Sequence, residues 1–216
     1  MKRLTVLACV CLTIGGCGVG VNRSFKIADQ TVRDGGLHTV NGSIRIGEDC
    51  TIGGDCHTVN GRIELGDGST SGSLMTVNGR VRVGASCEVD GDLGAVNGDL
   101  DCGTGTVIRG GVETVNGDVT LNGARVDYDV ETVNGDVDLL AGAVVGGDIV
   151  ISGSSSGGTV EIRILEGSVV EGDVRVRGRR DVTVFLDSTG VVLGSIRGAE
   201  VVRDDASGDE DPGDPT

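Results

Sequence analysis

The sequence predicts an all-β, single-domain parallel β-helix, a solenoid built from coils of 18 or 19 residues. Two observations predict it. The tetrapeptide Thr-Val-Asn-Gly begins at residues 39, 58, 76, 114 and 132, with Ala-Val-Asn-Gly at residue 95, so successive starts lie 18 or 19 residues apart. A fixed period near 20 is typical of coils stacked on one another. Between the repeats, apolar and polar residues alternate in short runs, which indicates strands with one face inward.

Composition agrees with this fold class. Glycine contributes 40 of the 216 residues, aromatic residues make up 1 %, and there are only two prolines. High glycine without proline excludes a collagen-like chain, and no apolar series at helical spacing runs for more than a turn. The formal net charge of −15 argues against nucleic acid and anionic lipid surfaces as partners, because both repel acidic proteins.

Four inward columns are expected in each coil, counted from the first residue of each repeat. The position five residues on holds Ile44, Ile63, Val81, Leu100, Val119 and Val137. Two further on stand Ile46, Leu65, Val83, Cys102, Leu121 and Leu139. About five residues later come Ile52, Val89, Val107, Val126 and Val144. Two residues before the next repeat stand Cys56, Leu74, Leu93, Val112, Val130 and Ile149.

The repeat fixes the expected extent of the solenoid. Gly20-Val21-Asn22 aligns with the repeat at its N-terminal end and the apolar pattern continues to Val202, so residues 20–203 form about nine coils. A right-handed turn follows from the rule for connections between parallel strands. A left-handed coil of three hexapeptides has the same length and is the alternative. Residues 204–216 are acidic and poor in apolar side chains, which predicts a disordered tail.

The repeat itself predicts a polar ladder. The asparagines should stack from coil to coil, each amide bonding the next. The glycine after each asparagine is expected to supply a positive φ at a sharp corner, and the threonine to pack inward or bond the backbone. The ladder comprises Asn22, Asn41, Asn60, Asn78, Asn97, Asn116 and Asn134.

The N-terminal segment has the features of an export signal. Lys2 and Arg3 precede an apolar run that ends at Ile14, too short to span a bilayer and typical of a secretory leader. Ile14-Gly15-Gly16-Cys17 resembles the lipobox of bacterial lipoproteins. The resemblance implies a signal peptide over residues 1–16, lipid attachment over residues 17–19 with Cys17 as the modified residue, and a place in the cell envelope. Gly18 after the cysteine resembles the pattern for the outer membrane of Gram-negative bacteria.

The full form of the repeat, Thr-Val-Asn-Gly-Asp-Val, occurs at 114–119 and 132–137. It resembles bacterial adhesin-type domains of unknown function and is similar, more distantly, to the polymer-forming bactofilins. The resemblance covers about residues 20 to 202 and implies a structural or adhesive role without catalytic residues. Bactofilins are generally cytoplasmic and stack through open coil ends, whereas this chain carries an export signal and a predicted lipid at one end.

Three groups of side chains could carry chemistry. Cys50 and Cys56 flank one corner, where an oxidising compartment would favour a disulfide. His38 and His57 should stack on adjacent coils with Met75 beyond them, which would suit a soft metal. Asp99, Asp118 and Asp136 follow successive Asn-Gly corners and would repel one another unless a cation such as calcium bridged them. Solvent-facing histidines, a solvated acidic stripe and free core cysteines are the respective alternatives.

These observations predict a membrane-anchored envelope lipoprotein with a structural, adhesive or interaction role and no catalysis. A self-assembling polymer-forming scaffold is the alternative, and a polysaccharide-active β-helix enzyme is disfavoured because aromatic platforms for sugars are scarce. No cofactor is expected, apart from the calcium alternative. The expected partners are the membrane, through the N-terminal lipid, and a protein or cell-surface partner, with self-association as a further alternative.

Overall fold

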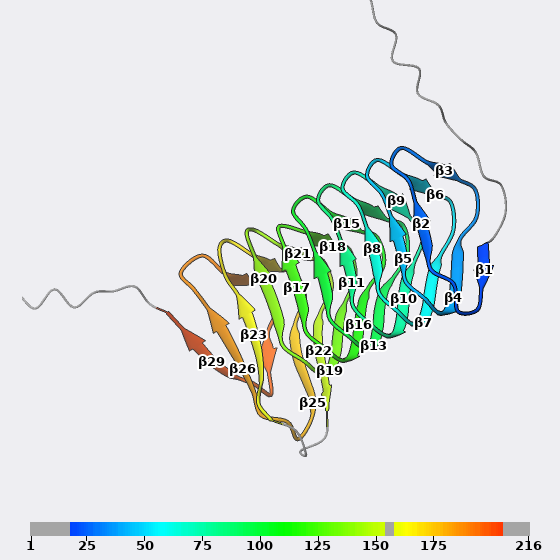
Figure 1. Cartoon of the computed structure of the whole chain (residues 1–216). Coiled ribbons are helices and arrows are strands. Elements are labelled where there is room, and N and C mark those ends of the chain that lie inside the picture. Colours follow the sequence, from blue (N-terminus) through cyan, green and yellow to red (C-terminus); the bar gives the residue numbers. More distant parts are fainter. Residues whose placement is uncertain (1–17, 154–157, 205–216) are drawn as a thin grey trace, which may run out of the picture.

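The chain forms a β-solenoid of ten coils, seen in the computed structural model as a stack that runs from blue to red (Figure 1). The structure describes residues 18–153 and 158–204. The leader, Cys17 and tail residues 205–216 lie outside the described residues. Within the described ranges all regular structure is β, so no helix there could cross a membrane.

Each of the first nine coils contributes one strand to each of three parallel sheets, which we name A, B and C, and the tenth contributes to A and B alone. Sheet A consists of β1 (Gly18–Gly20), β4 (Leu37–Asn41), β7 (Cys56–Asn60), β10 (Leu74–Asn78), β13 (Leu93–Asn97), β16 (Val112–Asn116), β19 (Val130–Asn134), β22 (Ile149–Gly153), β25 (Val174–Gly178) and β28 (Ile196–Arg197). Sheet B consists of β2 (Phe25–Ile27), β5 (Ile44–Ile46), β8 (Ile63–Leu65), β11 (Val81–Val83), β14 (Leu100–Cys102), β17 (Val119–Asn122), β20 (Val137–Leu140), β23 (Val160–Ile164), β26 (Val182–Leu186) and β29 (Glu200–Arg203). Sheet C consists of β3 (Val32–Arg33), β6 (Thr51–Ile52), β9 (Thr70–Ser71), β12 (Glu88–Val89), β15 (Val107–Ile108), β18 (Arg125–Val126), β21 (Val144–Val145), β24 (Val169–Val170) and β27 (Val191–Val192).

The predicted parallel β-helix is confirmed, with one coil more than expected. Strand β1 begins at Gly18, two residues before the predicted start, and pairs with β4 so that Gly20 lies beside Thr39. At the other end β28 and β29 complete a tenth coil. At about 4.8 Å per coil, the stack is roughly 43 Å long.

Three of the four predicted inward columns are confirmed. The remaining one, which lies in sheet C, needs a correction. In sheet C the buried residues are Ile108 and Val145, both 0 % exposed, whereas Val107 and Val144 point outward. Each wrong assignment falls in a doublet of two apolar residues, where alternation cannot say which one faces the core. The register of the neighbouring strands decides it, because Val89 pairs with Ile108.

The predicted positive φ holds for only part of the repeat glycines, and what they share is a close approach to the previous coil. Gly79 and Gly117 have φ values of +151° and +157°, as predicted, whereas Gly98 and Gly135 do not have a positive φ. Instead, a Cβ on Gly98 would lie 1.9 Å from the carbonyl oxygen of Gly79, its counterpart one coil earlier, and a Cβ on Gly135 would lie 1.9 Å from that of Gly117. Glycine is therefore required because adjacent coils approach each other too closely for any side chain at this corner.

The threonine of the repeat points inward and joins consecutive coils. Thr58 and Thr76 are 3 % and 4 % exposed. Their hydroxyl groups donate to the carbonyl oxygens of Gly42 over 2.8 Å and of Gly61 over 3.0 Å. The inward orientation leaves the valine that follows each threonine facing outward.

Candidate interaction surface on sheet A

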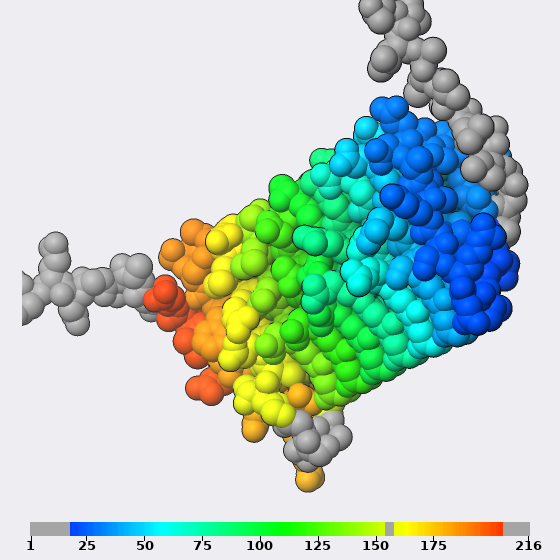
Figure 2. Space-filling view, viewed as in Figure 1, coloured from blue at the N-terminus to red at the C-terminus, as the bar shows by residue number. Residues whose placement is uncertain are grey.

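The outer face of sheet A carries an unbroken row of exposed valines, which we call the valine column. Its members are between 38 % and 41 % exposed, and each lies beside the next at the spacing of the coils. Figure 2 shows that the lower flank of the molecule, from cyan to green, is an even series of ridges, as expected of stacked coils. The column comprises Val40, Val59, Val77, Val96 and Val115.

A second outward row runs parallel to the valine column, two residues earlier in each strand, and we call it the mixed column. Along the stack it changes from imidazole to thioether to carboxylate. Two shallow hollows of about 360 Å³ and 250 Å³ lie between the columns, and both are lined by Met75, Thr76 and Val96. They therefore form one continuous groove. The mixed column comprises His38, His57, Met75, Gly94, Glu113 and Glu131.

The histidines of the mixed column stack as predicted. Their ring centroids lie 5.1 Å apart in an edge-to-face arrangement. Burial, followed by the neighbouring His38, lowers the pKa of His57, because both effects disfavour its charged form. His57 Nε2 is buried and has no hydrogen-bond partner within the described residues. Met75 occupies the next strand in the same column, so these three residues are brought together as expected.

The asparagine ladder borders the valine column and is continuous. From Asn41 to Asn134, each Nδ2 donates to the Oδ1 of the asparagine one coil earlier over distances of 2.7 to 2.9 Å. At its C-terminal end Arg180 donates to Asn134 Oδ1. Every asparagine keeps one N–H and one oxygen lone pair for an outside partner.

Asp99, Asp118 and Asp136 also stack, but their carboxylates are engaged with the protein. Asp99 Oδ1 accepts from the backbone N–H of Asp118 over 3.3 Å, and Asp118 Oδ1 accepts from that of Asp136 over 2.9 Å. Arg80 donates to Asp99 Oδ2 over 2.6 Å, and this hydrogen bond lowers the pKa of Asp99. In residues 18–153 and 158–204 no three His, Cys, Asp or Glu side chains are grouped as a metal site would need.

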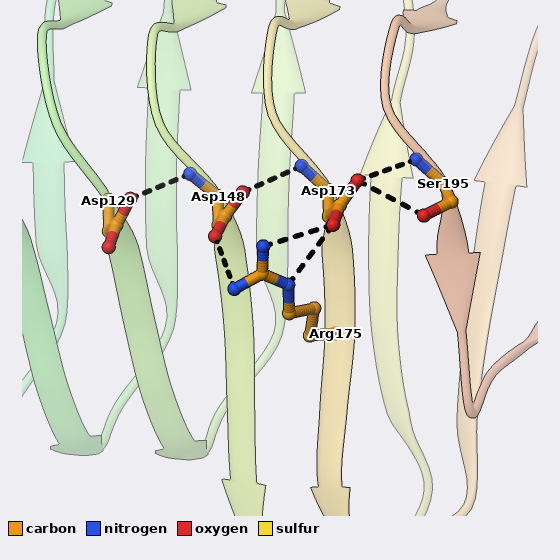
Figure 3. Close-up of polar contacts among 5 residues, drawn as sticks. All are labelled: Asp129, Asp148, Asp173, Arg175 and Ser195. Carbon is orange, nitrogen blue, oxygen red and sulfur yellow. Dashed lines mark hydrogen bonds and ion pairs between the residues drawn. The ribbon is translucent and has the colours of Figure 1, made fainter.

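Aspartates that accept from the backbone of the next coil recur at the corner before sheet A, where they were not predicted from the sequence. Asp129, Asp148 and Asp173 each accept, through Oδ1, from the backbone N–H one coil further on, over 2.7 to 2.8 Å (Figure 3). Arg175 joins two of them, bonding Asp148 Oδ2 over 2.8 Å and Asp173 Oδ2 over 3.0 Å. The missed signal was an aspartate recurring directly before the first residue of successive sheet A strands.

Acid is expected to destabilise the chain through this corner. The backbone N–H of Ser195, followed by Arg175, lowers the pKa of Asp173 from 3.8 to about 2. Between those two values the unfolded chain binds more protons, so stability present above pH 4 is lost as the pH falls through the folded pKa. Asp173→Asn should lower stability at pH 7 and flatten its decline between pH 4 and 2, measured by urea unfolding at each pH.

The matched control for this prediction is Asp181→Asn, at an exposed aspartate whose side chain makes no hydrogen bond among the described residues. It should leave the decline unchanged. If Asp173→Asn and Asp181→Asn gave the same profile as the parent chain, the corner aspartates would carry none of the acid sensitivity.

The predicted bridge between Cys50 and Cys56 is not formed in the structure. Both are buried free thiols, as are Cys87 and Cys102. Cys50 Sγ lies within hydrogen-bond distance of the carbonyl oxygen of Ala28, at 3.1 Å. Burial raises the pKa of Cys56 to about 12, which keeps its thiol protonated and unreactive.

Comparisons with models of protein families, with curated proteins and with solved structures find no match. The resemblance to adhesin-type domains and bactofilins therefore stays an expectation from the repeat.

Proposed function

We propose that this protein is a membrane-anchored envelope lipoprotein that acts as a rigid interaction module, holding a partner against the outer face of sheet A. The observation that carries the proposal is the valine column. Contiguous exposed apolar surface on a folded domain marks a contact with another molecule. Here five such residues succeed one another without a polar interruption.

The architecture suits a display role. Each of the first nine coils is tied to its neighbours among them by three parallel strand pairings, and side-chain ladders join many of the corners. Such a stack presents the two columns at a constant spacing over coils two to seven. The proposed lipid on Cys17 would adjoin strand β1 directly, because Gly18 is the first residue of that strand.

End-to-end stacking into filaments finds less support. The first coil holds Arg33 on an inward position of sheet C, where it is 8 % exposed. Phe25 and Arg33 both approach Gly18 of strand β1. The guanidinium donates from Nε to the carbonyl oxygen of Gly35 over 3.0 Å, so this end of the core is polar and disfavours apolar docking of another coil end.

If Cys17 carries the lipid anchor, its mutation should abolish both lipid labelling and membrane association. In a bacterial host supplied with a labelled fatty acid, the full-length chain should take up label and sediment with membranes. Cys17→Ala should remove the label and move the protein out of the membrane fraction, since Cys17 would be the residue acylated. Cys11→Ala, in the segment proposed to be removed, is the matched control and should behave like the parent. Equal labelling of the Cys17→Ala chain would contradict the proposal.

A further inference from the structure

We propose that the partner on sheet A is a second copy of this chain, lying antiparallel and face to face about a two-fold axis that runs along the strands between β10 and β13. This inference rests on the proposed role of the sheet A face and names its partner. A two-fold axis in that direction keeps each column opposite itself and reverses the order of the coils. Coils two to seven of one copy then face coils seven to two of the other.

The first support is polar complementarity in the mixed column. The reversal places His57 opposite Glu113 of the other copy and His38 opposite Glu131, and symmetry makes each contact twice. A neutral histidine offers one ring N–H, which for His57 has to be at Nδ1 because Nε2 is buried, and the carboxylate accepts it. Neither glutamate has an ion pair among the described residues, so both are available. Complementary groups at four places in one register favour that register over its neighbours.

The second support is the fit at the centre. Met75 and Gly94 lie on the two strands beside the axis, and Met75 Cε lies 3.0 Å from the position that a Cβ on Gly94 would take. The methionine therefore covers the glycine of its own copy, and the two methionines meet at the centre of the pair. Two flexible thioethers can repack against each other across the axis, which suits the adaptable packing of methionine.

The third support is the valine column, which faces itself across the same axis. It pairs with itself as Val77 with Val96, Val59 with Val115, and Val40 with the half-buried Val133. Beyond coil seven the face changes, because Val150 in β22 is only 1 % exposed. The row from Val40 to Val133 therefore pairs with itself in the same register as the polar groups.

A pair in which the two solenoids run parallel matches the surface groups less well. An axis along the solenoid would place the mixed column of one copy against the valine column of the other, coil by coil. Glu113 would then lie against Val115 of the partner, and the burial of an unpaired carboxylate costs free energy. Only the antiparallel arrangement satisfies both columns at once.

The size of the face predicts weak pairing. Six coils and the adjoining columns cover roughly 300–400 Å² per copy, about half of what a standard stable interface buries on each side. The antiparallel arrangement also sets the two N-termini at opposite ends of the pair. Copies anchored in two apposed membranes could therefore pair across the gap, where many weak contacts act together. The face would in that case serve adhesion between like surfaces.

Sedimentation of the mature chain carrying Cys17→Ala tests the pairing in solution. We expect a reversible monomer–dimer equilibrium in a concentration series up to about 1 mM. Lysine at both central valines, Val77→Lys with Val96→Lys, should weaken pairing more than tenfold, because central residues dominate interface energies. Val191→Lys, at a 42 % exposed valine on sheet C, is the matched control and should pair normally. Monomers throughout, with the fold intact by circular dichroism, would overturn the inference.

Cysteine cross-linking tests the antiparallel order. A mixture of Val40→Cys and Val133→Cys chains should form a mixed disulfide, because the two positions face each other. Val40→Cys alone should remain unlinked, since its two copies would lie five coils apart, about 24 Å along the stack. A disulfide between two Val40→Cys chains, with none in the mixture, would overturn the antiparallel arrangement.

A photo-reactive amino acid at Val77 in the full-length chain, expressed in a bacterial envelope, separates this inference from the proposed function. Cross-links between copies of the chain are the expected result. Cross-links to a different protein would contradict the pairing of two copies but would agree with an interaction role for sheet A. No cross-link at Val77, with the protein folded and anchored, would sink both.

Discussion

A Gly98→Ala chain is expected to lose more than about 3 kcal/mol of unfolding free energy, although the change adds a single methyl group. The new Cβ would lie 1.9 Å from the carbonyl oxygen of Gly79, far inside van der Waals contact. Neither side of this contact is a flexible side chain. Gly79 N–H donates to Asn97 O over 3.0 Å, and Gly98 N–H donates to Asn116 O over 2.9 Å. Relief of the clash therefore requires two coils to separate.

The matched control is Gly142→Ala. Gly142 has a φ of +75°, and nothing lies within 4 Å of the Cβ position. The alanine there meets conformational strain without a clash, at a cost of about 1 kcal/mol. Its neighbour Ala141 already has a φ of 53°, so this corner accepts an alanine in the left-handed region. Urea unfolding of both variants measures the difference, and equal losses would mean that close approach of the coils is not what selects glycine at residue 98.

The sequence was sufficient to predict the solenoid because each coil repeats the same local signal. A strand of two or three residues is too short to assign on its own, but Ile44, Ile63 and Val81 recur at one position and reinforce one another. The prediction failed where that signal was absent. In Val107-Ile108 both residues are apolar, so only the pairing with β12 shows which one is inward.

Contacts between coils were harder to predict than the coils themselves. The role of the repeat glycine depends on a carbonyl group 19 residues away, and no local propensity encodes that distance. The hydrogen bonds that Asp129, Asp148 and Asp173 accept from backbone N–H groups of the following coil have the same origin. The stacking of Asn, Asp and His side chains could be predicted, because a constant period brings equivalent residues together.

The candidate surface was present in the sequence but not recognised there. The asparagine and the threonine carry the polar signal of the repeat, whereas the orientation of the valine between them depends on that of the threonine. Once Thr76 is known to face inward, alternation requires that Val77 face outward. The change along the mixed column from His57 to Glu113 carries no meaning until the order of the coils is fixed. Only then do these residues lie at equal distances from one centre.

Leu121→Ala is expected to lower the free energy of unfolding by about 2–5 kcal/mol. Leu121 is fully buried in sheet B, between Cys102 and Leu139 in the adjacent coils. Its neighbours are held at the coil spacing by the backbone ladders, so they cannot close the cavity that the alanine leaves. The loss should therefore lie toward the upper part of that range.

Leu193→Ala provides the comparison, since the same atoms are removed from a side chain that is 67 % exposed. Its effect should stay within about 0.5 kcal/mol. Because each coil contacts only its neighbours, a cavity in the sixth coil weakens the stack on both sides of it. Leu193 directly follows β27, the terminal strand of sheet C, so a change there affects one side alone. Hydrogen exchange of the amides in β14 and β20 would detect the weakening of the neighbouring coils, as faster exchange on both sides of Leu121. Faster exchange confined to β17 would show that the coils open independently and that the interior is not one continuous core.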